Sequence, residues 1–155
     1  MLEIYEMPGH LIRRLNQVTV SLFVEETSKE GFDLTPVQYA ALIAINSMPG
    51  LDQASVASHI AYDRVTIGGV IDRLVQKELV RRETNPNDRR ARRLYLTEGG
   101  TETLQKIRPI VWRLQEELLA GLEHAEREQF VSLLRKVAEH ANEKSRAPLR
   151  VDWQQ

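Results

Sequence analysis

Arginine is the residue type whose chemistry stands out in this chain, and it is concentrated in one place. Six arginines lie between Leu79 and Thr97, on either side of the sequence Asn85-Pro86-Asn87-Asp88. The planar guanidinium group forms paired hydrogen bonds with phosphates and with guanine edges, so such a run suits the binding of nucleic acid. A lone basic hairpin can equally be a solvated loop, and only the segments before it can decide between these readings.

The net charge of −1 hides an uneven distribution of charge along the chain. Residues 51–93 contain nine Lys/Arg and six Asp/Glu, a net charge of +3, whereas residues 1–50 carry −3 and residues 94–155 carry −1. Phosphate neutralisation depends on the charges that face the duplex, so local basicity is what a DNA-binding surface requires.

Other kinds of chemistry have little support in the sequence. The chain has no cysteine, which excludes disulfides, thiolate metal sites and a thiol redox switch. Ser55, His59 and Asp63 share a four-residue spacing that superficially resembles a catalytic triad or a metal pair. Asp63, however, is better placed to cap a helix, and His59 is typical of a partly buried histidine. We therefore predict that the protein is not an enzyme and has no metal and no cofactor.

The length of 155 residues fits a domain of ordinary size with a real core. No apolar run approaches the roughly 20 residues that a membrane span needs. The N-terminal segment 1–6 is acidic, where a secretory signal would be basic. We expect no membrane association and a location in the cytoplasm.

Helices are expected to position the arginine run. Residues 3 to about 30 have apolar residues at helical spacing, followed by Gly31 as a C-terminal cap. The sequence Thr35-Pro36-Val37-Gln38 predicts a capping box that starts a second helix, which stops at Met48-Pro49-Gly50. A short third helix is expected from Asp52, and a fourth from Asp63 to about Lys77.

Two short helices in tandem that lead into a basic hairpin are the pattern of a winged helix-turn-helix. Val80–Thr84 and Arg92–Leu96 are the expected strands of the hairpin. In this arrangement the second helix of the pair enters the major groove of DNA. Its paired glycines, Gly68 and Gly69, are poor helix formers. They either let the backbone approach DNA closely or let another helix pack tightly, and the sequence leaves both readings open.

The segments outside the winged region predict a second, helical region. After Thr97, which can act as a cap, apolar residues recur at spacings of three and four as far as Leu122, and a last amphipathic helix is expected over residues 125–144. Together with the first helix they offer more apolar surface than a small winged domain can cover, which favours a symmetric homodimer. We predict a dimerisation region at 1–30 and 98–145, a winged domain at 34–97, and a tail at 146–155. The tail is either loose or docked on the partner chain.

At this level of detail the chain resembles the MarR family of transcriptional regulators. The wing motif is the most specific part, an Asp-x-Arg followed by a hydrophobic residue, then x-Leu-Thr-x-x-Gly. One position departs from the family, since Glu78 stands where glycine usually follows the recognition helix. This predicts either a cap that is not left-handed or a strain of about 1 kcal/mol. The resembling segments are Leu34–Tyr39, Ile71–Val80, Asn85–Ala91 and Leu94–Gly100.

The resemblance implies a mainly α fold with a small β-hairpin wing, and a set of residues that bind double-stranded DNA. Arg90 would reach the minor groove, and Asp88 would pair with a nearby arginine to hold the wing. A narrow, A·T-rich minor groove has the negative potential that attracts arginine. The implied DNA-binding residues are Gln53 and Ser55 on the third helix, Arg64, Thr66, Gly68, Gly69 and Arg73 on the recognition helix, and Asp88, Arg89 and Arg90 on the wing.

The resemblance also implies a small aromatic carboxylate or phenolic effector, bound in a cleft between the dimer helices and the winged domain. The first helix carries a polar stripe of His10, Arg14 and Gln17, with Tyr39 and Trp112 as aromatic walls. Arg13 is expected to point away from this stripe. The stripe is open to a second reading, as the hydrated edge of a buried helix face.

The sequence as a whole is interpreted as a ligand-responsive repressor. It would bind a pseudo-palindromic operator as a homodimer and be released by the effector. The alternative is a winged-helix module for protein interaction without DNA binding. The arginines argue against this alternative, because the core of a protein interface is usually depleted in charge.

Overall fold

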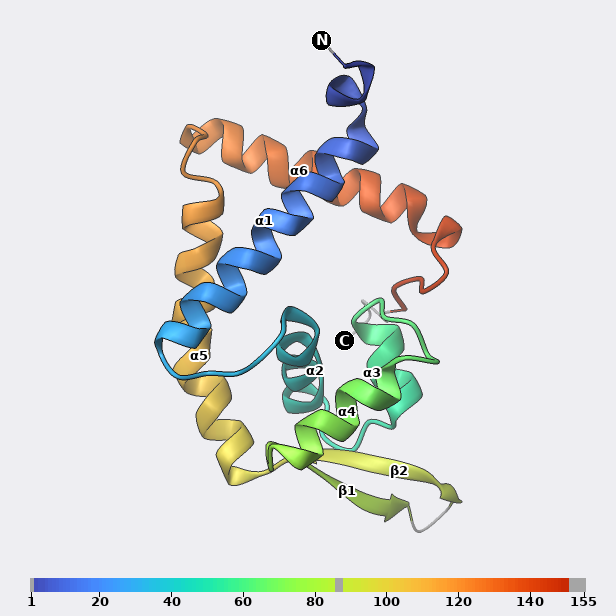
Figure 1. The fold of residues 1–155 in the computed structure, drawn as a ribbon. Coiled ribbons are helices and arrows are strands. Elements are labelled where there is room, and N and C mark those ends of the chain that lie inside the picture. Colours follow the sequence, from blue (N-terminus) through green and yellow to red (C-terminus); the bar gives the residue numbers. More distant parts are fainter. Residues whose placement is uncertain (1, 86–87, 151–155) are drawn as a thin grey trace.

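The computed structural model describes residues 2–85 and 88–150, which form a mainly helical structure with one antiparallel hairpin (Figure 1). The predicted fold class is thus confirmed. In chain order the elements are η1 (Glu3–Glu6), α1 (Pro8–Lys29), α2 (Pro36–Ser47), α3 (Gln53–His59), α4 (Ile67–Gln76), β1 (Val80–Asn85), β2 (Asp88–Leu96), α5 (Glu98–Leu118), α6 (His124–Ala141) and η2 (Asn142–Lys144).

Helices α1 and α5 lie side by side, and α2 packs against both of them. The compact unit formed by α2, α3, α4 and the hairpin lies at one end of this pair, and α6 extends away from the opposite end of α5 (Figure 1). Across the described ranges, no helix is both long and apolar enough to cross a membrane.

The hairpin is fixed to the helical unit by backbone hydrogen bonds. Val80 pairs with Leu96, and the register continues along the strands to a shift between Thr84 and Asn85. The N–H of Gly50 donates to the carbonyl oxygen of Leu94 at 2.9 Å, and the N–H of Leu94 donates to that of Leu51 at 2.9 Å. The segment between α2 and α3 therefore lies along the free edge of β2.

One hydrophobic core holds α2, α3, α4, the hairpin and α5 together. Leu42, Ile45, Ile67, Ile71 and Leu74 are fully buried in it. Helix α1 contributes mainly its C-terminal half, through the buried Phe23 and Thr27. Further buried apolar residues of this cluster are Leu34, Ala41, Ala44, Val56, Ala57, Val70, Val80, Leu94, Leu104, Ile107 and Leu114.

The predicted helix starts at Thr35, Asp52 and Thr97 are confirmed. Thr35 and Gln38 form a reciprocal capping box on α2. The Asp52 carboxylate accepts from the Ser55 N–H at 2.7 Å, and the Thr97 hydroxyl accepts from the Gly100 N–H at 2.9 Å. Each cap satisfies a backbone donor that the first turn of a helix leaves free.

Left-handed residues close α1, α3 and α4, with Ala61 after α3 at φ of +52°. Gly31 closes α1 with φ of +82°, as predicted, and the N–H of Phe32 reaches back to the Thr27 carbonyl at 2.9 Å. Glu78 closes α4 with φ of +57°, and the N–H of Leu79 donates to the Leu74 carbonyl at 3.0 Å. The cap after α4 is therefore left-handed without glycine, and Glu78 carries a backbone cost of about 1 kcal/mol.

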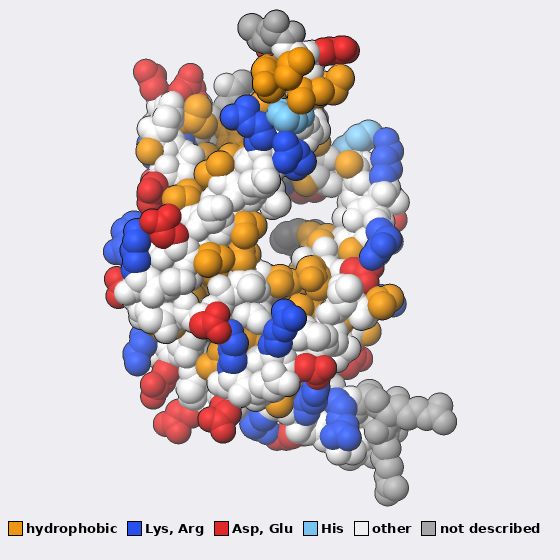
Figure 2. Space-filling model, in the orientation of Figure 1, with side chains coloured by type: hydrophobic (Ala, Val, Ile, Leu, Met, Phe, Trp, Pro, Cys, Tyr) orange, Lys and Arg blue, Asp and Glu red, His pale blue; other side chains and the backbone are white. Residues whose placement is uncertain are grey.

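The outer helices leave much apolar surface uncovered. Helix α6 contains no buried residue, and α1 buries only Phe23 and Thr27. Figure 2 shows hydrophobic side chains gathered along the face of the molecule that α1 occupies. The exposed apolar residues of the two helices are Leu11, Ile12, Val18, Val20 and Val24 on α1, and Val131, Leu133, Leu134 and Val137 on α6.

Candidate DNA-binding surface and effector cavity

The turn that leads into α4 is organised by Asp63. Its Oδ1 accepts from the backbone N–H groups of Val65 at 2.9 Å and Thr66 at 3.2 Å. We expected the helix itself to begin at Asp63, and this is wrong, because α4 begins at Ile67 with Thr66 as its N-cap. The carboxylate caps a preceding turn instead, so Arg64 lies in that turn and Thr66 at its end, both exposed.

Arg64 contacts the neighbouring helix. Its Nη2 donates to the Ser58 hydroxyl on α3 at 3.1 Å. Together with Ser55 these side chains line a shallow hollow on the outer face of α3. Ser55 is half-buried there, with its N–H held by Asp52. The first turn of α3 and the turn before α4 thus form one continuous polar surface.

The paired glycines of α4 have different surroundings. A Cβ atom at Gly68 would lie 3.1 Å from the amide nitrogen of Gln53 on α3, so this glycine lets the two helices pack closely. A Cβ atom at Gly69 would meet nothing within 4 Å. Gly68 therefore fits the prediction of tight helix packing, and Gly69 fits the prediction of an open backbone face.

The wing is attached to α4 by an ion pair. Arg82 of β1 donates from Nη2 to the Asp72 carboxylate at 2.5 Å. Arg81, on the other face of the strand, pairs with Glu83 and lies 4.8 Å from the centre of the Tyr95 ring. These two arginines are thus occupied within the wing, as strand alternation led us to expect for part of the run. Arg73 is exposed on α4, one residue after Asp72.

The wing tip contains three of the predicted DNA-binding residues. Asp88, Arg89 and Arg90 form the first residues of β2, and Asp88 pairs with Asn85 in the register. Their side chains lie outside the described part of the structure. The predicted minor-groove contact of Arg90 and the predicted ion pair of Asp88 therefore stay predictions.

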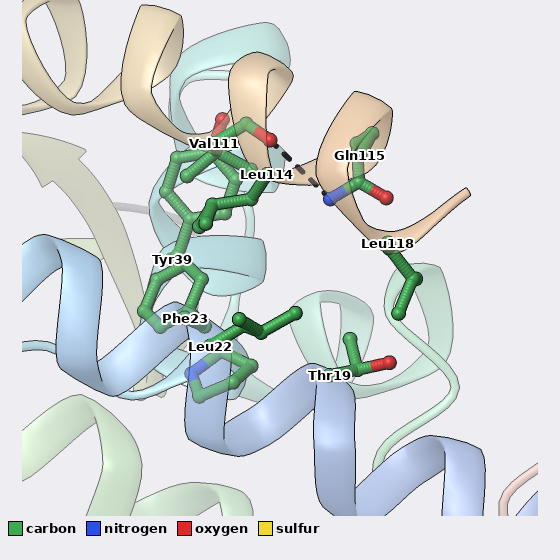
Figure 3. A pocket seen from close by; sticks show the side chains of 9 residues that line it. Thr19, Leu22, Phe23, Tyr39, Val111, Leu114, Gln115 and Leu118 are labelled. Carbon is green, nitrogen blue, oxygen red and sulfur yellow. Dashed lines mark hydrogen bonds between the residues drawn. The ribbon is translucent and has the colours of Figure 1, made fainter. Parts of the chain in front are cut away.

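A cavity of about 200 Å³ lies where α1, α2 and α5 meet (Figure 3). Its wall is mainly apolar, and the lining residues that carry polar groups are Thr19, Tyr39 and Gln115. An apolar cavity of roughly 150 Å³ is large enough to hold benzene, so this one is of the size of a single aromatic ring. The lining residues are Thr19, Leu22, Phe23, Pro36, Tyr39, Val111, Leu114, Gln115 and Leu118.

Among the predicted effector residues, Tyr39 alone lines this cavity. His10 is half-buried and Arg14 and Gln17 are exposed, all in the N-terminal half of α1, whereas Trp112 is 68% exposed on α5. Within one chain, the polar stripe of α1 and the cavity are therefore separate features.

The expected direction of Arg13 was wrong. Its Nη1 donates to the Gln17 Oε1 at 2.8 Å, and its Nη2 lies 3.4 Å from the His10 Nδ1. Residues three and four apart share a face of a helix, which places Arg13 beside the stripe instead of opposite it.

Sequence reasoning missed Arg108, which lies beside the Tyr39 hydroxyl. Burial raises the pKa of Tyr39 above its usual value, and the Arg108 guanidinium opposes part of this rise. The phenol is therefore neutral near pH 7 and can both donate and accept a hydrogen bond. The signal in the sequence is weak, because Arg108 is one of two exposed arginines on α5.

The comparisons with known proteins agree with this geometry. The profile described as "MarR family" matches residues 34–91. The HTH-type transcriptional repressor NicR of Pseudomonas putida is 31% identical over 135 residues, which cover 87% of this chain and 84% of NicR. The chain belongs to the MarR family. Its fold, its recognition helix and its arginine-rich wing are those of a DNA-binding transcriptional regulator rather than of an enzyme.

Two solved structures of MarR-family regulators extend the comparison. PcaV of Streptomyces coelicolor, solved in complex with its natural ligand, has a TM-score of 0.81 and 35% identity, covering 91% of this chain and 98% of PcaV. BpsR of Bordetella bronchiseptica, whose DNA binding is regulated by 6-hydroxynicotinic acid, has a TM-score of 0.81 and 30% identity, covering 89% of this chain and 97% of BpsR. This chain is therefore a ligand-responsive DNA-binding regulator of this family.

Proposed function

We propose that the protein is a homodimeric repressor that binds a pseudo-palindromic operator and is released by a small aromatic or phenolic acid. Two winged domains related by a two-fold axis would read two half-sites, so the operator would carry the same symmetry. Binding of the acid would favour an arrangement of the winged domains that fits the operator less well.

The main observation that supports DNA binding is the exposed surface formed by the start and the outer face of α4. Arg64 and Thr66 stand exposed at its beginning, Arg73 lies two turns further along, and Gly69 leaves the backbone open between them. Arginine and threonine side chains at such positions suit base edges and phosphates in the major groove. Gln53 and Ser55, on the adjoining first turn of α3, are suited to contact phosphate.

The wing supplies the second part of the proposed DNA surface. Its base is held to α4 by Arg82 and Asp72, which fixes the direction in which the tip projects. Basic side chains gather next to the hairpin in Figure 2. We assign Arg89 and Arg90 to DNA, with Arg90 in the minor groove and Asp88 steadying the tip.

The uncovered helices support the proposed dimer. Burial of apolar surface gives about 25 cal/mol for each Å², so a row of exposed apolar residues on α1 and α6 favours association with a second copy. Val137 is 57% exposed and Leu133 53% exposed on α6. A dimer formed through these helices would place the two recognition helices at a fixed spacing.

The cavity supports the proposed effector. Its size fits one aromatic ring, and the Tyr39 ring in its wall can stack on that ring. Arg108 lies beside the Tyr39 hydroxyl and can pair with an acid group. We further propose that His10, Arg14, Gln17 and Trp112 complete the site from the partner subunit, because within one chain they do not line the cavity.

Selection of duplexes from a random library, followed by fluorescence anisotropy at several salt concentrations, tests the DNA part. Arg64→Ala and Arg73→Ala are each expected to weaken binding to the selected duplex by roughly 1–3 kcal/mol. Lys106→Ala removes an exposed cation on α5 and serves as the matched control, expected to bind like the wild type. Unchanged affinity in both arginine variants would refute the proposed surface.

Calorimetric titration with benzoate, 4-hydroxybenzoate and 6-hydroxynicotinate tests the effector part. We expect binding of at least one acid, release of DNA by that acid, and loss of both effects in Arg108→Ala or Arg14→Ala. Cyclohexanecarboxylate and benzamide are the matched ligand controls, since one lacks the aromatic ring and the other the charge. If neither arginine variant altered the response to an acid that releases the wild type from DNA, the proposed site would be wrong.

A further inference from the structure

The segment that follows α6 returns to the winged domain of the same chain. The N–H of Arg150 donates to the Ser58 carbonyl on α3 at 2.9 Å. The Arg146 guanidinium holds the Asp63 carboxylate, with Nε 3.0 Å and Nη2 2.8 Å from Oδ2. Figure 1 shows this end of the chain beside α3. The tail was expected to be loose or to dock on a partner, and its described residues 146–150 contact the winged domain of their own chain.

The segment is held in shape by its own hydrogen bonds. The Asn142 amide donates to the Leu149 carbonyl at 3.1 Å and accepts from the Leu149 N–H at 2.8 Å. Arg150 forms two hydrogen bonds with Glu143, at 2.6 and 2.9 Å. Residues 142–150 therefore form a closed loop joined directly to α6, which we call the strap.

The strap binds to the groups that organise the start of α4. Asp63 uses Oδ1 to hold the turn containing Arg64 and Thr66, and it offers Oδ2 to Arg146. Ser58 accepts from Arg64 with its hydroxyl and from Arg150 with its carbonyl. Both contacts of the strap thus fall on residues that already hold the side chains proposed to read DNA.

The Asp63 carboxylate is suited to hold both the turn before α4 and Arg146. The Asp63 side chain is only 20% exposed, and the hydrogen bonds from Arg146 hold its pKa below the usual range of an aspartate. It is therefore ionised at every pH at which the protein would bind DNA. A charged acceptor of this kind forms stronger and more directional hydrogen bonds than a neutral one.

We propose that Arg146 is a positioning residue for DNA recognition: through Asp63, the strap sets the start of the recognition helix relative to α6. This rests on the proposed function, in which Arg64 and Thr66 contact DNA. In this proposal Arg146 acts through Asp63, which its Nε and Nη2 face, and a phosphate contact from its 84% exposed side chain is the alternative that the test must separate. The strap thereby connects the proposed dimer helix α6 with the surface that reads the operator.

The test measures the affinity of the full-length protein for the duplex selected from a random library and for a scrambled duplex, at several salt concentrations. We expect Arg146→Ala to weaken binding to the selected duplex by roughly tenfold, which corresponds to about 1.4 kcal/mol. Binding to the scrambled duplex should be unchanged. The slope of log K against log salt should also keep its wild-type value, because no phosphate contact is lost.

A double-mutant cycle with Asp63→Asn separates positioning from general stabilisation. If Arg146 acts through Asp63, Arg146→Ala causes no further loss in the Asp63→Asn background. Arg146→Lys should recover part of the affinity, because lysine can still pair with the carboxylate. Circular dichroism confirms that each variant is folded.

Three results would overturn the proposal. A lower salt slope in Arg146→Ala would make Arg146 a phosphate contact, and an unchanged affinity for the selected duplex would show that the strap has no part in recognition. Additive effects in the double-mutant cycle would show that Arg146 acts independently of Asp63. Arg64→Ala, measured in parallel, tests the proposed function separately, since it should weaken binding whether or not the strap matters.

Discussion

Helices α4 and α6 are both amphipathic, but the chain covers only one of them. Helix α4 buries Ile67, Val70, Ile71 and Leu74 in the core of the winged domain. Helix α6 has no buried residue, and its residues Val131, Leu133, Leu134 and Val137 are 42–57% exposed. The same kind of sequence pattern is thus buried in the core in one region and, among the described residues, stays largely uncovered in the other.

The difference indicates two sources of stability. The winged domain is stabilised by contacts within one chain, so its stability should not depend on protein concentration. In the proposed dimer a second copy would cover helices α1 and α6, so the part of the stability that they supply should rise with concentration. The stability of each region can therefore be tested separately.

The largest effect on stability is expected from a substitution that leaves a cavity in the core of the winged domain. Ile71 is fully buried, and Ile71→Ala should lower the free energy of unfolding by about 2–5 kcal/mol. Urea unfolding measures this loss, which should be equal at low and high protein concentration. Val137→Ala on α6 is the matched control, and its effect should appear only where dimers form. A loss below 1 kcal/mol for Ile71→Ala would contradict the intrachain assignment.

A charge on α6 should separate the subunits without unfolding the winged domain. Leu134→Glu places a carboxylate within the proposed interface, where burial without a partner is unfavourable. We expect dimer affinity to fall at least 100-fold, or about 3 kcal/mol. Sedimentation equilibrium measures the mass, which should be that of one chain for Leu134→Glu and of two chains for the control Glu139→Gln. A variant that keeps the mass of two chains would place the interface elsewhere.

Local signals made much of the fold predictable. The capping box at Thr35, the caps at Asp52 and Thr97, and the glycine after α1 depend on residues within a few positions of one another, and all were confirmed. The hairpin followed from two strand-like segments around Asn85-Pro86-Asn87-Asp88. The start of α4 was misplaced because an Asp63 carboxylate looks the same in sequence whether it caps a helix or a turn before one.

Contacts between distant segments were not predictable in this way. Arg146 and Asp63 are 83 residues apart, and nothing in the composition of the tail selects Asp63 as its partner. Arg108 beside Tyr39 depends equally on how α5 packs against α2. The candidate DNA surface was predicted from the family resemblance. This was possible because its residues lie close together in the chain. The cavity draws its walls from α1, α2 and α5, and only Tyr39 was anticipated.

A smaller effect of opposite sign is expected at the end of α4. Glu78 has φ of +57°, where glycine has no Cβ penalty. Glu78→Gly should therefore raise the free energy of unfolding by about 1 kcal/mol and the melting temperature by roughly 2–4 °C. Gln105→Gly, in the exposed interior of α5, is the matched control and should lose about 1 kcal/mol. Destabilisation by both glycines would show that Glu78 contributes contacts that outweigh the backbone cost.

The smallest effect is expected from an ion pair that joins α4 to the loop before α2. The Lys77 ammonium lies 2.8 Å from Asp33 Oδ2, but the Asp33 side chain is 99% exposed. Lys77 lowers the pKa of Asp33 from its usual value of 3.8. A lowered pKa in the folded state stabilises the protein above the pKa of the unfolded state, and this contribution is lost as pH falls through the folded value. Solvent and salt screen so exposed a pair.

Asp33→Asn should therefore lower the melting temperature slightly at pH 5–7, by less than Glu78→Gly raises it. The difference from wild type should shrink as the pH falls below 3.8 and through the lowered pKa of Asp33, and it should also shrink in high salt. Carboxyl ¹³C NMR titration checks the cause, since Lys77→Met should return the pKa of Asp33 towards its usual value. Glu30→Gln removes another exposed carboxylate nearby in the sequence and controls for net charge. A large, salt-insensitive loss in Asp33→Asn would instead make this pair a main attachment of α4, and the winged domain would then depend on the α1–α2 loop as much as on its core.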